Sequence, residues 1–413
     1  MSLTPLATAR KAALDALRPA SPTRVPLLEA LGRFLAQDVV ASRSLPGCPV
    51  SAMDGYAVRA EDTSGSNRDR PARLRVVDTI YAGHLPSRSL QSGEASRIFT
   101  GAPLPQGATA IVRQEATLVP AEGLVDVCVS VPPGKDIRPT GEDILEGMPL
   151  LRAGQRVEAS MLGVLASMGD THVLVRPLPR VAVLATGDEL VPPGAPALPH
   201  QVYESNLILV AAMALEAGAR VVAQERARDE DEMLRSALQR LAQGTDVLIT
   251  TGGASVGDKD RVKGLLAGLG ASFLVDGVAL KPGKPVAVAR LGTTTVVVLP
   301  GTPGAATVAF DQFARPLLLR YQGVSEERQR VRVRLDAERH KQAGFTYLIT
   351  GTLETSDDGQ VWTRMRVHGA GQHLQNIAAE GYAVLPPGRA DFVFGDEVDF
   401  ERFDRPRFLP VEP

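Results

Sequence analysis

Alternating strand-like and helix-like segments between residues 179 and 325 constrain the fold of this chain more than any other feature. The apolar and β-branched runs VAVLAT, RVVAQE, DVLITT and TTVVVLP are typical of buried strands. Residues 206–217, 230–242 and 305–321 carry the apolar spacing of helices. This order predicts an α/β domain with a mostly parallel sheet and helices on both faces. Since ligands bind such sheets beyond the carboxyl ends of the strands, the loops after residues 186, 251 and 299 are expected to converge.

The rest of the sequence indicates further domains, as expected for 413 residues. Short strands and turns over 46–143 predict a small β domain. It is inserted between residues 1–45 and 144–178, which are expected to form an elongated helical and extended linking domain. The α/β domain occupies 179–325, with a polar linker at 322–328. Alternating residues then return, and 326–413 is expected to form a C-terminal β domain similar to a barrel.

The segment 246–260 is the most informative of the sheet loops. A predicted strand runs into a turn of small residues that includes Gly252, Gly253 and Ser255. Glycine allows the backbone to approach a ligand closely, and a following helix start presents free N–H groups to an anion. Asp258 and Asp260 come next, and their charge fits such a site better if a cation also binds there. The alternative is an ordinary turn with capping aspartates.

Other loops add acids and cations to the same predicted region. Glu189 follows a Gly-Asp turn and could bind Mg²⁺ or orient water, or it could be a helix-cap or solvent residue. Lys281 and Lys284 flank a Pro-Gly turn, which suits a phosphate or oxyanion, although a solvated hairpin turn has the same composition. Further candidates with equally plausible structural roles lie in stiff turns: Asp54, Thr100, Asp143, and Pro300 with Pro303. Ser205 or Asn206 could simply cap the helix at 206–217, and Asp229 could cap the helix at 230–242.

Several functional classes are disfavoured by composition. The net charge of −2 lacks the basic excess of nucleic-acid proteins, and no apolar run is long enough to span a membrane. Two cysteines, no signal peptide and no metal-type His/Cys spacing indicate a cytoplasmic, reducing location without zinc. Carboxylates combined with lysines are what a Mg²⁺-dependent reaction at a phosphate anhydride needs.

The motifs SAMDGYAV, FTGAPLPQGATAIVRQE, RPTGEDI, ATGDEL, YESN, TTGGASVGDKD, KPGKP and LPGTPG occur in an order that resembles the molybdopterin molybdenumtransferases, the bacterial family related to the C-terminal domain of gephyrin. The resemblance covers residues 5–325 well and the last domain loosely. It implies a Mg²⁺-dependent cytoplasmic enzyme that takes adenylyl-molybdopterin and molybdate, releases AMP and leaves molybdenum on the dithiolene. It also implies a four-domain homodimer, a site between the α/β domain of one subunit and the β domain of the other, and the molybdopterin adenylyltransferase as a partner.

The resemblance assigns roles to particular residues. Those implied as catalytic are Asp54, Thr100, Asp143, Glu189 and Asp260. Those implied as substrate-binding are Lys281, Lys284, Gly252, Gly253, Ser255, Pro300 and Pro303. The Mg²⁺ ligands would be Glu189, Asp229 and Asp260.

Some positions depart from the family pattern. Thr302 replaces the usual Asn of the PGNP turn, Glu204 lengthens the usual YDSN motif, and residues 369–388 lack the usual glycine and serine segment. These departures leave open a non-catalytic or tungstate-specialised paralogue. A gephyrin-like scaffold is a further alternative, although a scaffold needs neither the acids nor the lysines. The adenylyltransferase itself has a similar glycine loop but would not account for the two β domains.

Overall fold

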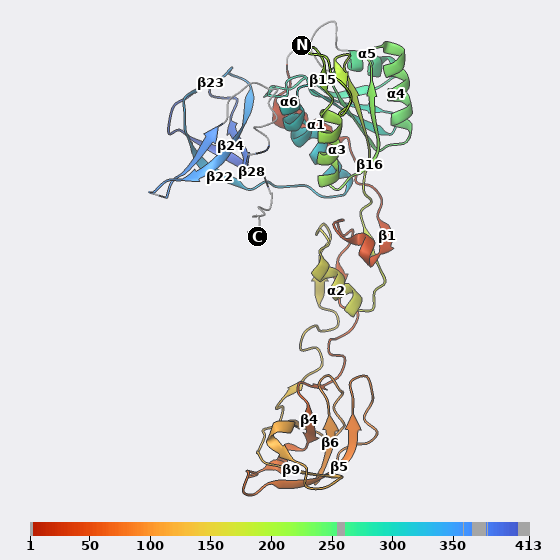
Figure 1. Ribbon diagram of the computed structural model, residues 1–413, viewed down its shortest axis with the longest axis vertical. Helices are drawn as coiled ribbons and strands as arrows, with labels where there is room; N and C mark the ends of the chain where they lie inside the picture. Colours follow the sequence, from red (N-terminus) through yellow and green to blue (C-terminus); the bar gives the residue numbers. More distant parts are fainter. Residues whose placement is uncertain (1–2, 254–260, 358, 366–376, 378, 404–413) are drawn as a thin grey trace. The chain divides into compact units, whose positions relative to one another are not determined.

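A six-stranded sheet positions the predicted site loops (Figure 1). Strands β16, β13, β17 and β21 are parallel neighbours, and β20 runs antiparallel to both β21 and β18. The sheet order is β16 (Arg220–Ala227), β13 (Arg180–Thr186), β17 (Val247–Thr251), β21 (Thr294–Leu299), β20 (Ala287–Leu291), β18 (Ser272–Asp276). The central strands β17 and β21 are buried along their whole length, whereas the edge strand β16 alternates between exposed and half-buried residues. The predicted mostly parallel sheet is confirmed.

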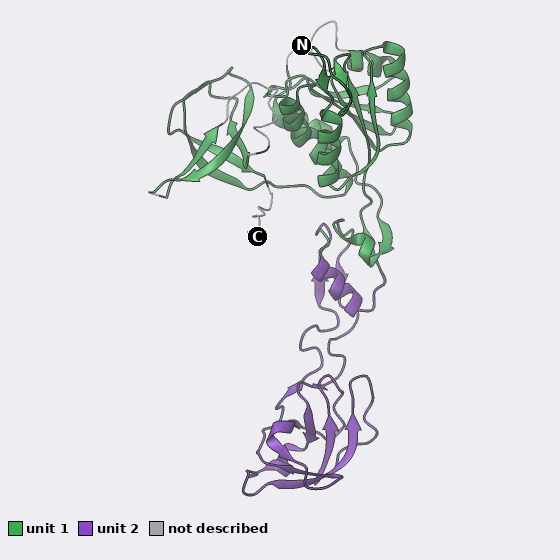
Figure 2. Cartoon of the chain, in the orientation of Figure 1, with its two compact units in different colours: residues 1–36, 156–158, 172–413 green, residues 37–155, 159–171 purple. Residues whose placement is uncertain are grey.

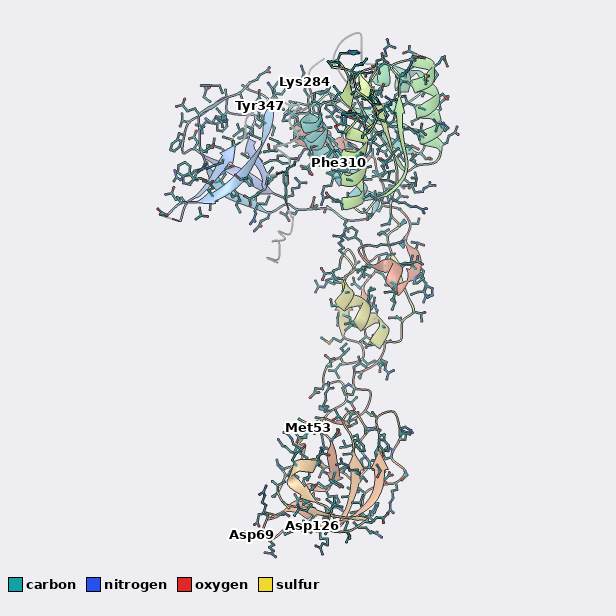
Figure 3. The ribbon with its side chains drawn as sticks, in the orientation of Figure 1. Met53, Asp69, Asp126, Lys284, Phe310 and Tyr347 are labelled. Atoms are coloured by element: carbon teal, nitrogen blue, oxygen red, sulfur yellow. The ribbon has the colours of Figure 1, made fainter. Side chains whose placement is uncertain are left out.

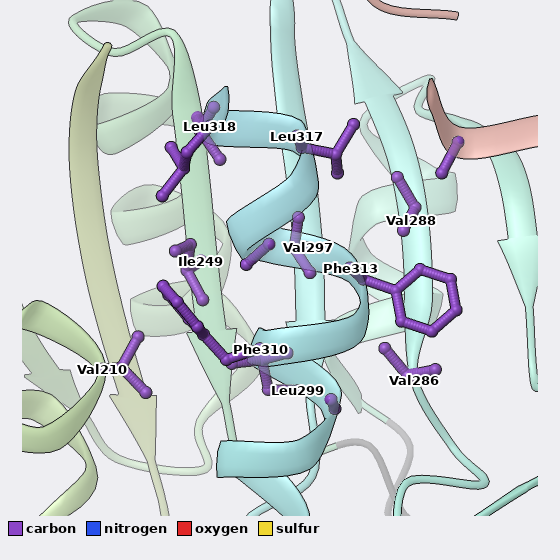
Figure 4. Packing of buried hydrophobic residues seen from close by; sticks show 14 of the residues in the cluster. Val210, Ile249, Val286, Val288, Val297, Leu299, Phe310, Phe313, Leu317 and Leu318 are labelled. Atoms are coloured by element: carbon purple, nitrogen blue, oxygen red, sulfur yellow. The ribbon is translucent and has the colours of Figure 1, made fainter. Parts of the chain in front are cut away.

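Helices cover both faces of this sheet, because alternate strand residues point to opposite sides. One hydrophobic cluster joins the sheet to α1 (Leu6–Asp15), α3 (Asn206–Glu216), α6 (Pro303–Ala309) and α7 (Arg315–Tyr321). The other joins it to α4 (Asp231–Gln243) and α5 (Arg261–Gly268). Figure 4 shows Phe310 and Phe313 of the first cluster between the helices and the strands. Both rings are buried, with exposed fractions of 0% and 1%.

Two features of this core differ from the expectations. The helix predicted at 305–321 contains a π-helical turn, η4 (Phe310–Ala314), between α6 and α7. Gln322, expected in a polar linker, is fully buried, and its amide nitrogen donates to the carbonyl groups of Ala217 (2.9 Å) and Leu318 (3.0 Å). The first bond satisfies a carbonyl just past the end of α3, while the Leu318 carbonyl also accepts from the backbone N–H of Gln322 (3.3 Å). The periodicity of the sequence does not show that a polar residue such as Gln322 is buried and bonds to helix carbonyls.

The C-terminal region contains a closed barrel of five strands, in agreement with the prediction. Its order is β24 (Thr346–Thr355), β25 (Val361–Met365), β22 (Arg330–Leu335), β28 (Glu397–Arg402), β26 (Gly381–Leu385), with β26 pairing back to β24. Gly381 allows this closure, because a Cβ atom there would lie 2.2 Å from the carbonyl oxygen of Glu401. Two short strands, β23 (Arg339–His340) and β27 (Asp391–Phe392), form a separate pair.

The computed structural model describes residues 3–253, 261–357, 359–365, 377 and 379–403. The chain divides into two compact units (Figure 2): unit 1 holds 1–36, 156–158 and 172–413, and unit 2 holds 37–155 and 159–171. Within unit 1, β1 (Thr23–Pro26) pairs with β12 (His172–Val175), and η1 (Leu27–Ala30) follows as a single short 3-10 turn. The domain boundaries given above remain predictions.

Unit 2 is built around a second six-stranded sheet. The order is β7 (Ala110–Arg113), β4 (Gly55–Val58), β6 (Glu94–Ile98), β5 (Ala72–Ile80), β9 (Leu124–Val127), β8 (Thr117–Leu118). Two short pairs are separate from it: β3 (Val50–Ser51) with β10 (Ile137–Arg138), and β2 (Val39–Val40) with β11 (Pro149–Leu151). Helix α2 spans Ala159–Ser167, close to its predicted range. Across the described residues of both units, no helix has the length and apolar character needed to cross a membrane.

Candidate functional site

The loops at the carboxyl ends of β17 and β21 are joined by hydrogen bonds, as the sheet topology predicts. Asn206, at the start of α3, donates from its amide nitrogen to Thr251 Oγ1 (2.9 Å) and to the carbonyl oxygen of Gly301 (2.7 Å). Thr251 in turn donates to the carbonyl oxygen of Pro300 (3.1 Å). Asn206 is only 7% exposed, and its bond to Thr251 is buried, whereas its bond to the exposed Gly301 is only partly buried. Three segments that are distant in sequence thus form one surface beyond the sheet.

Gly252 lies at the centre of this surface. Its φ is 91°, and a Cβ atom at this position would lie 2.2 Å from the carbonyl oxygen of Thr186 at the end of β13. A Cβ atom on Gly301 would lie 3.3 Å from Gly252 Cα, so the turn also packs against the loop after β21. Only glycine fits this conformation and spacing. Gly253 follows at φ 64°, while the predicted residues Ser255 and Asp260 lie outside the described residues.

The acidic side of the surface comes from the loops after β13 and β16. Thr186 Oγ1 donates to a carboxylate oxygen of Asp229, and the backbone N–H of Asp229 donates to Asp188 Oδ1 (3.2 Å). The Arg261 guanidinium donates to the carbonyl oxygen of Asp229. Helix α4 begins after Glu230, and Asp229 does not cap it, contrary to the prediction. Asp229 is therefore held by neighbouring loops and is half-buried, while Glu189 beside Asp188 is exposed.

Glu204 is a functional residue of the loop that sequence reasoning did not identify. It was noted only as a longer side chain in the YESN motif, and the helix cap was expected from Ser205 or Asn206. Instead, both carboxylate oxygens of Glu204 accept from the backbone N–H of Leu207 (3.0 Å each). Burial raises the pKa of the Glu204 carboxyl, and the two N–H groups at the helix start oppose this effect. The side chain of Asn206 is thereby left free for the bonds described above.

The predicted lysine loop packs against α6, because a Cβ atom on Gly283 would lie 3.8 Å from Ala309 Cβ. Lys281 ends β19 (Leu280–Lys281), a short strand that pairs with β24 of the barrel. The turn that follows is closed by hydrogen bonds from Val278 N to the Lys284 carbonyl oxygen (2.9 Å) and from Val286 N to the Gly283 carbonyl oxygen (3.1 Å). Lys281 and Lys284 are both exposed. Figure 3 labels Lys284 together with Tyr347 of the barrel, a residue that sequence reasoning did not single out.

The two predicted prolines of the loop after β21 act through the backbone. The carbonyl of Pro300 accepts from Thr251, and Pro303 occupies the first turn of α6. Proline is favoured there because its missing N–H would have no partner in the helix. Thr302 precedes it as the cap residue, but its side chain makes no capping hydrogen bond. The hydroxyl that was expected beside the helix N–H groups thus does not cap them.

In unit 2, Asp54 and Thr100 are brought together as one group. An Asp54 carboxylate oxygen accepts from both the backbone N–H and the hydroxyl of Thr100 (2.8 Å each). Both hydrogen bonds lower the pKa of Asp54, and the bond from the backbone N–H has the larger effect. The positive charge of Arg97 lowers this pKa by a smaller amount. Asp54 is therefore held in its ionised form.

Arg97 supports this group and was not predicted. Its guanidinium lies 5.1 Å from the ring centre of Tyr56 and 4.9 Å from that of Phe99, and it donates to the Gly55 carbonyl oxygen (3.2 Å). Phe99 lies two positions after Arg97 in the sequence, whereas Tyr56 lies opposite Arg97 on the neighbouring strand β4, so local spacing shows only the first of the two rings. Asp143 lies on a turn whose backbone N–H donates to Leu45 (3.0 Å), and no hydrogen bond joins its side chain to Asp54.

The donor chemistry of the α/β loops fits a hard cation. Glu189 and Asp229 supply carboxylate oxygens, which are the ligands that Mg²⁺ prefers. Among the described residues no three His, Cys, Asp or Glu side chains gather closely enough to hold a metal. Asp260, the third predicted ligand, lies outside that part of the chain. Two carboxylates with open coordination positions are typical of Mg²⁺ sites, which retain water and substrate oxygens.

Comparisons with known proteins agree with the family that the ordered motifs resemble. Residues 4–169 match the family described as MoeA N-terminal region (domain I and II), and residues 182–320 match the probable molybdopterin binding domain. A protein of Mycobacterium tuberculosis named molybdopterin molybdenumtransferase 2 is 43% identical over 322 residues, which cover 76% of this chain and 78% of that protein. A molybdopterin molybdenumtransferase of Nostoc sp. is 35% identical over 380 residues, which cover 91% of this chain and 87% of the relative.

A solved structure shares the fold over nearly the whole chain. The molybdopterin biosynthesis moea protein from Pyrococcus horikosii superimposes with a TM-score of 0.83 at 28% identity, covering 98% of this chain and 100% of that one. The expectation drawn from the ordered motifs is thus confirmed by independent comparisons of sequence and of structure. The chain belongs to the molybdopterin molybdenumtransferase family.

Proposed function

We propose that this protein transfers molybdenum from molybdate to adenylyl-molybdopterin and releases AMP. The observation that carries the proposal is the joined surface beyond β17 and β21, where Asn206 ties the glycine turn to the loop at Gly301. Acidic residues border this surface on one side, and the lysine loop supplies cations. The substrates are anionic, and their phosphates and oxyanion need positive partners and a backbone that can approach closely.

Different residues of the site are proposed to have different roles. Gly252, Gly253, Ser255, Pro300 and Pro303 would shape the floor on which the substrate lies, and Lys281 and Lys284 would bind molybdate or phosphate oxygens. Asp54, Thr100, Asp143, Glu189 and Asp260 are proposed as the catalytic group. Within it, the Thr100 hydroxyl holds the Asp54 carboxylate ionised and oriented. Such an anion can accept a hydrogen bond or a proton at a defined position.

Mg²⁺ is proposed as the cofactor, held by Glu189, Asp229 and Asp260. When bound, it would neutralise negative charge on the phosphate anhydride. The hydroxyl of Thr186 and the side chain of Asp188 orient Asp229 for this role. Ligands that are themselves hydrogen-bonded bind metals in a fixed orientation.

The proposal is tested by measuring AMP release from adenylyl-molybdopterin with and without molybdate, in Mg²⁺ or in excess EDTA. We expect release that requires both. Lys284→Ala should raise the KM for molybdate at least about tenfold, because a charged hydrogen bond is lost. Glu189→Gln should raise the Mg²⁺ concentration needed for half-maximal rate. Lys11→Ala and Glu216→Gln, which change exposed charges on helices α1 and α3, serve as controls. A wild-type protein without molybdate-dependent release would overturn the proposal.

The biological setting is proposed by analogy with the family. The enzyme would act as a homodimer in the cytoplasm and receive its adenylylated substrate from the molybdopterin adenylyltransferase. Sedimentation of the purified protein tests the dimer, and competition with tungstate tests the choice of oxyanion. A scaffold or non-catalytic function has less support, because the relatives described above carry the name of the transferase.

A further inference from the structure

The C-terminal barrel is joined directly to the lysine loop. Strand β19 pairs in parallel with β24, with Leu280 opposite Thr346 and Lys281 opposite Tyr347. The backbone N–H of Thr346 donates to the carbonyl oxygen of Ala279 (2.9 Å). Leu280 is fully buried, which anchors this short strand in the core. The backbone that carries Lys281 is therefore held by the barrel, and the barrel side chains beside it can act on the same loop.

One aromatic ring of the barrel contacts two lysines. The ammonium nitrogen of Lys281 lies 5.4 Å from the ring centre of Tyr347, and that of Lys341 lies 5.5 Å from it. Lys341 is only 8% exposed and donates to the carbonyl oxygen of Phe345 (2.8 Å). The Tyr347 hydroxyl accepts from the backbone N–H of Gln342 (3.3 Å), which fixes the ring. Both ammonium groups lie within the range over which an aromatic face attracts a cation.

Lys281, Lys284 and Lys341 differ from other lysines of the chain in having no carboxylate beside them in the described residues. Lys11, Lys135 and Lys263 each form an ion pair with a nearby aspartate. In the described residues, no carboxylate lies within 4.0 Å of the ammonium groups of Lys281, Lys284 or Lys341. Among the described residues, these three lysines therefore place positive charge around one loop without a carboxylate to balance it, in a chain whose net charge is −2. A bound anion is the partner that would balance them.

We propose that Tyr347 and Lys341 extend the anion site of the lysine loop, Tyr347 as a positioning residue for Lys281 and Lys341 as a third positive charge. This inference rests on the proposed function, since it assigns the anion to the molybdate or phosphate of that reaction. A lysine side chain that moves freely loses conformational entropy when it binds a ligand, because rotation about several of its bonds becomes restricted. A ring that already holds the ammonium group reduces this loss, so the loop is prepared for the oxyanion before it arrives.

The kinetic test compares two substitutions that differ in one property. Tyr347→Phe keeps the aromatic face, whereas Tyr347→Leu removes it. We expect Tyr347→Leu to raise the KM for molybdate about two- to fivefold, the range for an exposed cation–π contact, and Tyr347→Phe to stay within about twofold. In a Lys281→Ala background, Tyr347→Leu should have a smaller effect than in the wild-type protein, because only the contact of the ring with Lys341 remains. Equal effects of Phe and Leu, or additive effects with Lys281→Ala, would overturn the positioning role.

The contribution of Lys341 has its own variant. Lys341→Met keeps most of the side-chain volume and removes the charge, so we expect a higher KM for molybdate and a weaker dependence of that KM on salt. Lys11→Ala, which removes an exposed lysine charge from helix α1, is the matched control. If Lys341→Met leaves the salt dependence unchanged, Lys341 does not belong to the anion site.

A second measurement is independent of turnover. The seven lysines (11, 135, 259, 263, 281, 284 and 341) can be methylated with ¹³C and observed by NMR. Ring currents should shift the signals of Lys281 and Lys341, and Tyr347→Leu should abolish the shift. Titration with molybdate or inorganic phosphate should move the signals of Lys281, Lys284 and Lys341 but not that of Lys11. If these signals respond while AMP release is absent, the anion site stands and the proposed reaction fails; if they do not respond, the anion site itself is refuted.

Discussion

Replacing Asn206 by alanine should weaken the joined surface beyond the sheet by an amount that the structure allows us to estimate. The substitution removes two hydrogen bonds, to Thr251 (2.9 Å) and to Gly301 (2.7 Å). Each contributes about 0.5–1.5 kcal/mol net, so the expected loss in the free energy of unfolding is about 2 kcal/mol. The carbonyl of Gly301 is exposed enough to accept water instead, and the Thr251 hydroxyl keeps its bond to Pro300, which places the loss within that range.

Asn206→Asp is the sharper version of the same test. The shape of the side chain is unchanged, but a carboxylate oxygen now faces the two oxygens that accepted from the amide. A buried charge without a donor costs more than a missing bond, so this variant should lose more stability than Asn206→Ala. We also expect lower rates of molybdate-dependent AMP release, because the glycine turn and the loop at Gly301 lose their connection.

The measurement is urea unfolding followed by circular dichroism, with hydrogen exchange of the peptide covering 299–304 as the local readout. Thr302→Ala is the control, since this exposed hydroxyl in the same loop makes no capping bond and should change stability by less than about 0.5 kcal/mol. The reasoning is refuted if Asn206→Ala and Asn206→Asp both resemble this control. It is also refuted if the aspartate variant is the more stable of the two.

Three further predictions follow from other contacts. Thr100→Val removes the hydrogen bond from the Thr100 hydroxyl to Asp54 but keeps the one from the backbone N–H, so the pKa of Asp54 should rise while staying below its ordinary value. A ¹³C NMR titration of the Asp54 carboxyl measures this pKa. The pKa of Asp54 is lower in the folded protein than in the unfolded chain, so the stability that Asp54 contributes is present above its unfolded pKa. This stability is lost as the pH falls through the folded pKa. Thr100→Val raises the folded pKa, so the variant should lose this stability at a higher pH than the wild-type protein. Gly252→Ala should cost more than about 1 kcal/mol and abolish AMP release, because its Cβ would lie 2.2 Å from a carbonyl oxygen; thermal unfolding and activity check both effects. Asp311→Asn removes the buried charge that pairs with the half-buried Arg328, which keeps a longer ion pair with Glu326 (3.7 Å), so we expect a loss of about 1.5–3 kcal/mol in urea unfolding; a loss below about 1 kcal/mol, as for exposed ion pairs, would contradict the role of burial.

The architecture of the α/β domain could be predicted because two strong signals agree. Strands such as β17 and β21 are apolar on both faces, and the segments between strands have helical spacing. Together they imply a sheet covered on both sides, and the topology then places the loops. The π-helical turn at Phe310 and the buried Gln322 could not be predicted, because each depends on which neighbours pack against the helix rather than on its own periodicity.

For the candidate site, the sequence pointed to particular loops, and the roles of their residues remain predictions. Motif order identified the loops at Gly252, Lys281 and Pro300, because each needs small, stiff or charged residues at fixed positions. The connections between loops were missed. Asn206 and Glu204 both looked like ordinary residues at a helix start, and only the three-dimensional arrangement shows that Glu204 caps the helix while Asn206 joins the loops. The contact between Lys281 and Tyr347 joins residues far apart in sequence, which no local pattern reveals.

The packing of α1 onto the α/β core has a consequence for the order in which the chain folds during synthesis. Ala9 and Ala13 belong to the same cluster as Val181 and Val210, although the whole of the segment 37–155 is made between them. At ribosomal rates, the first helix waits roughly 10–30 s for its partners, while the intervening β sheet is already complete. A newly made chain therefore carries an unpartnered helix for that time. We expect its packing to begin only once β13 has been made.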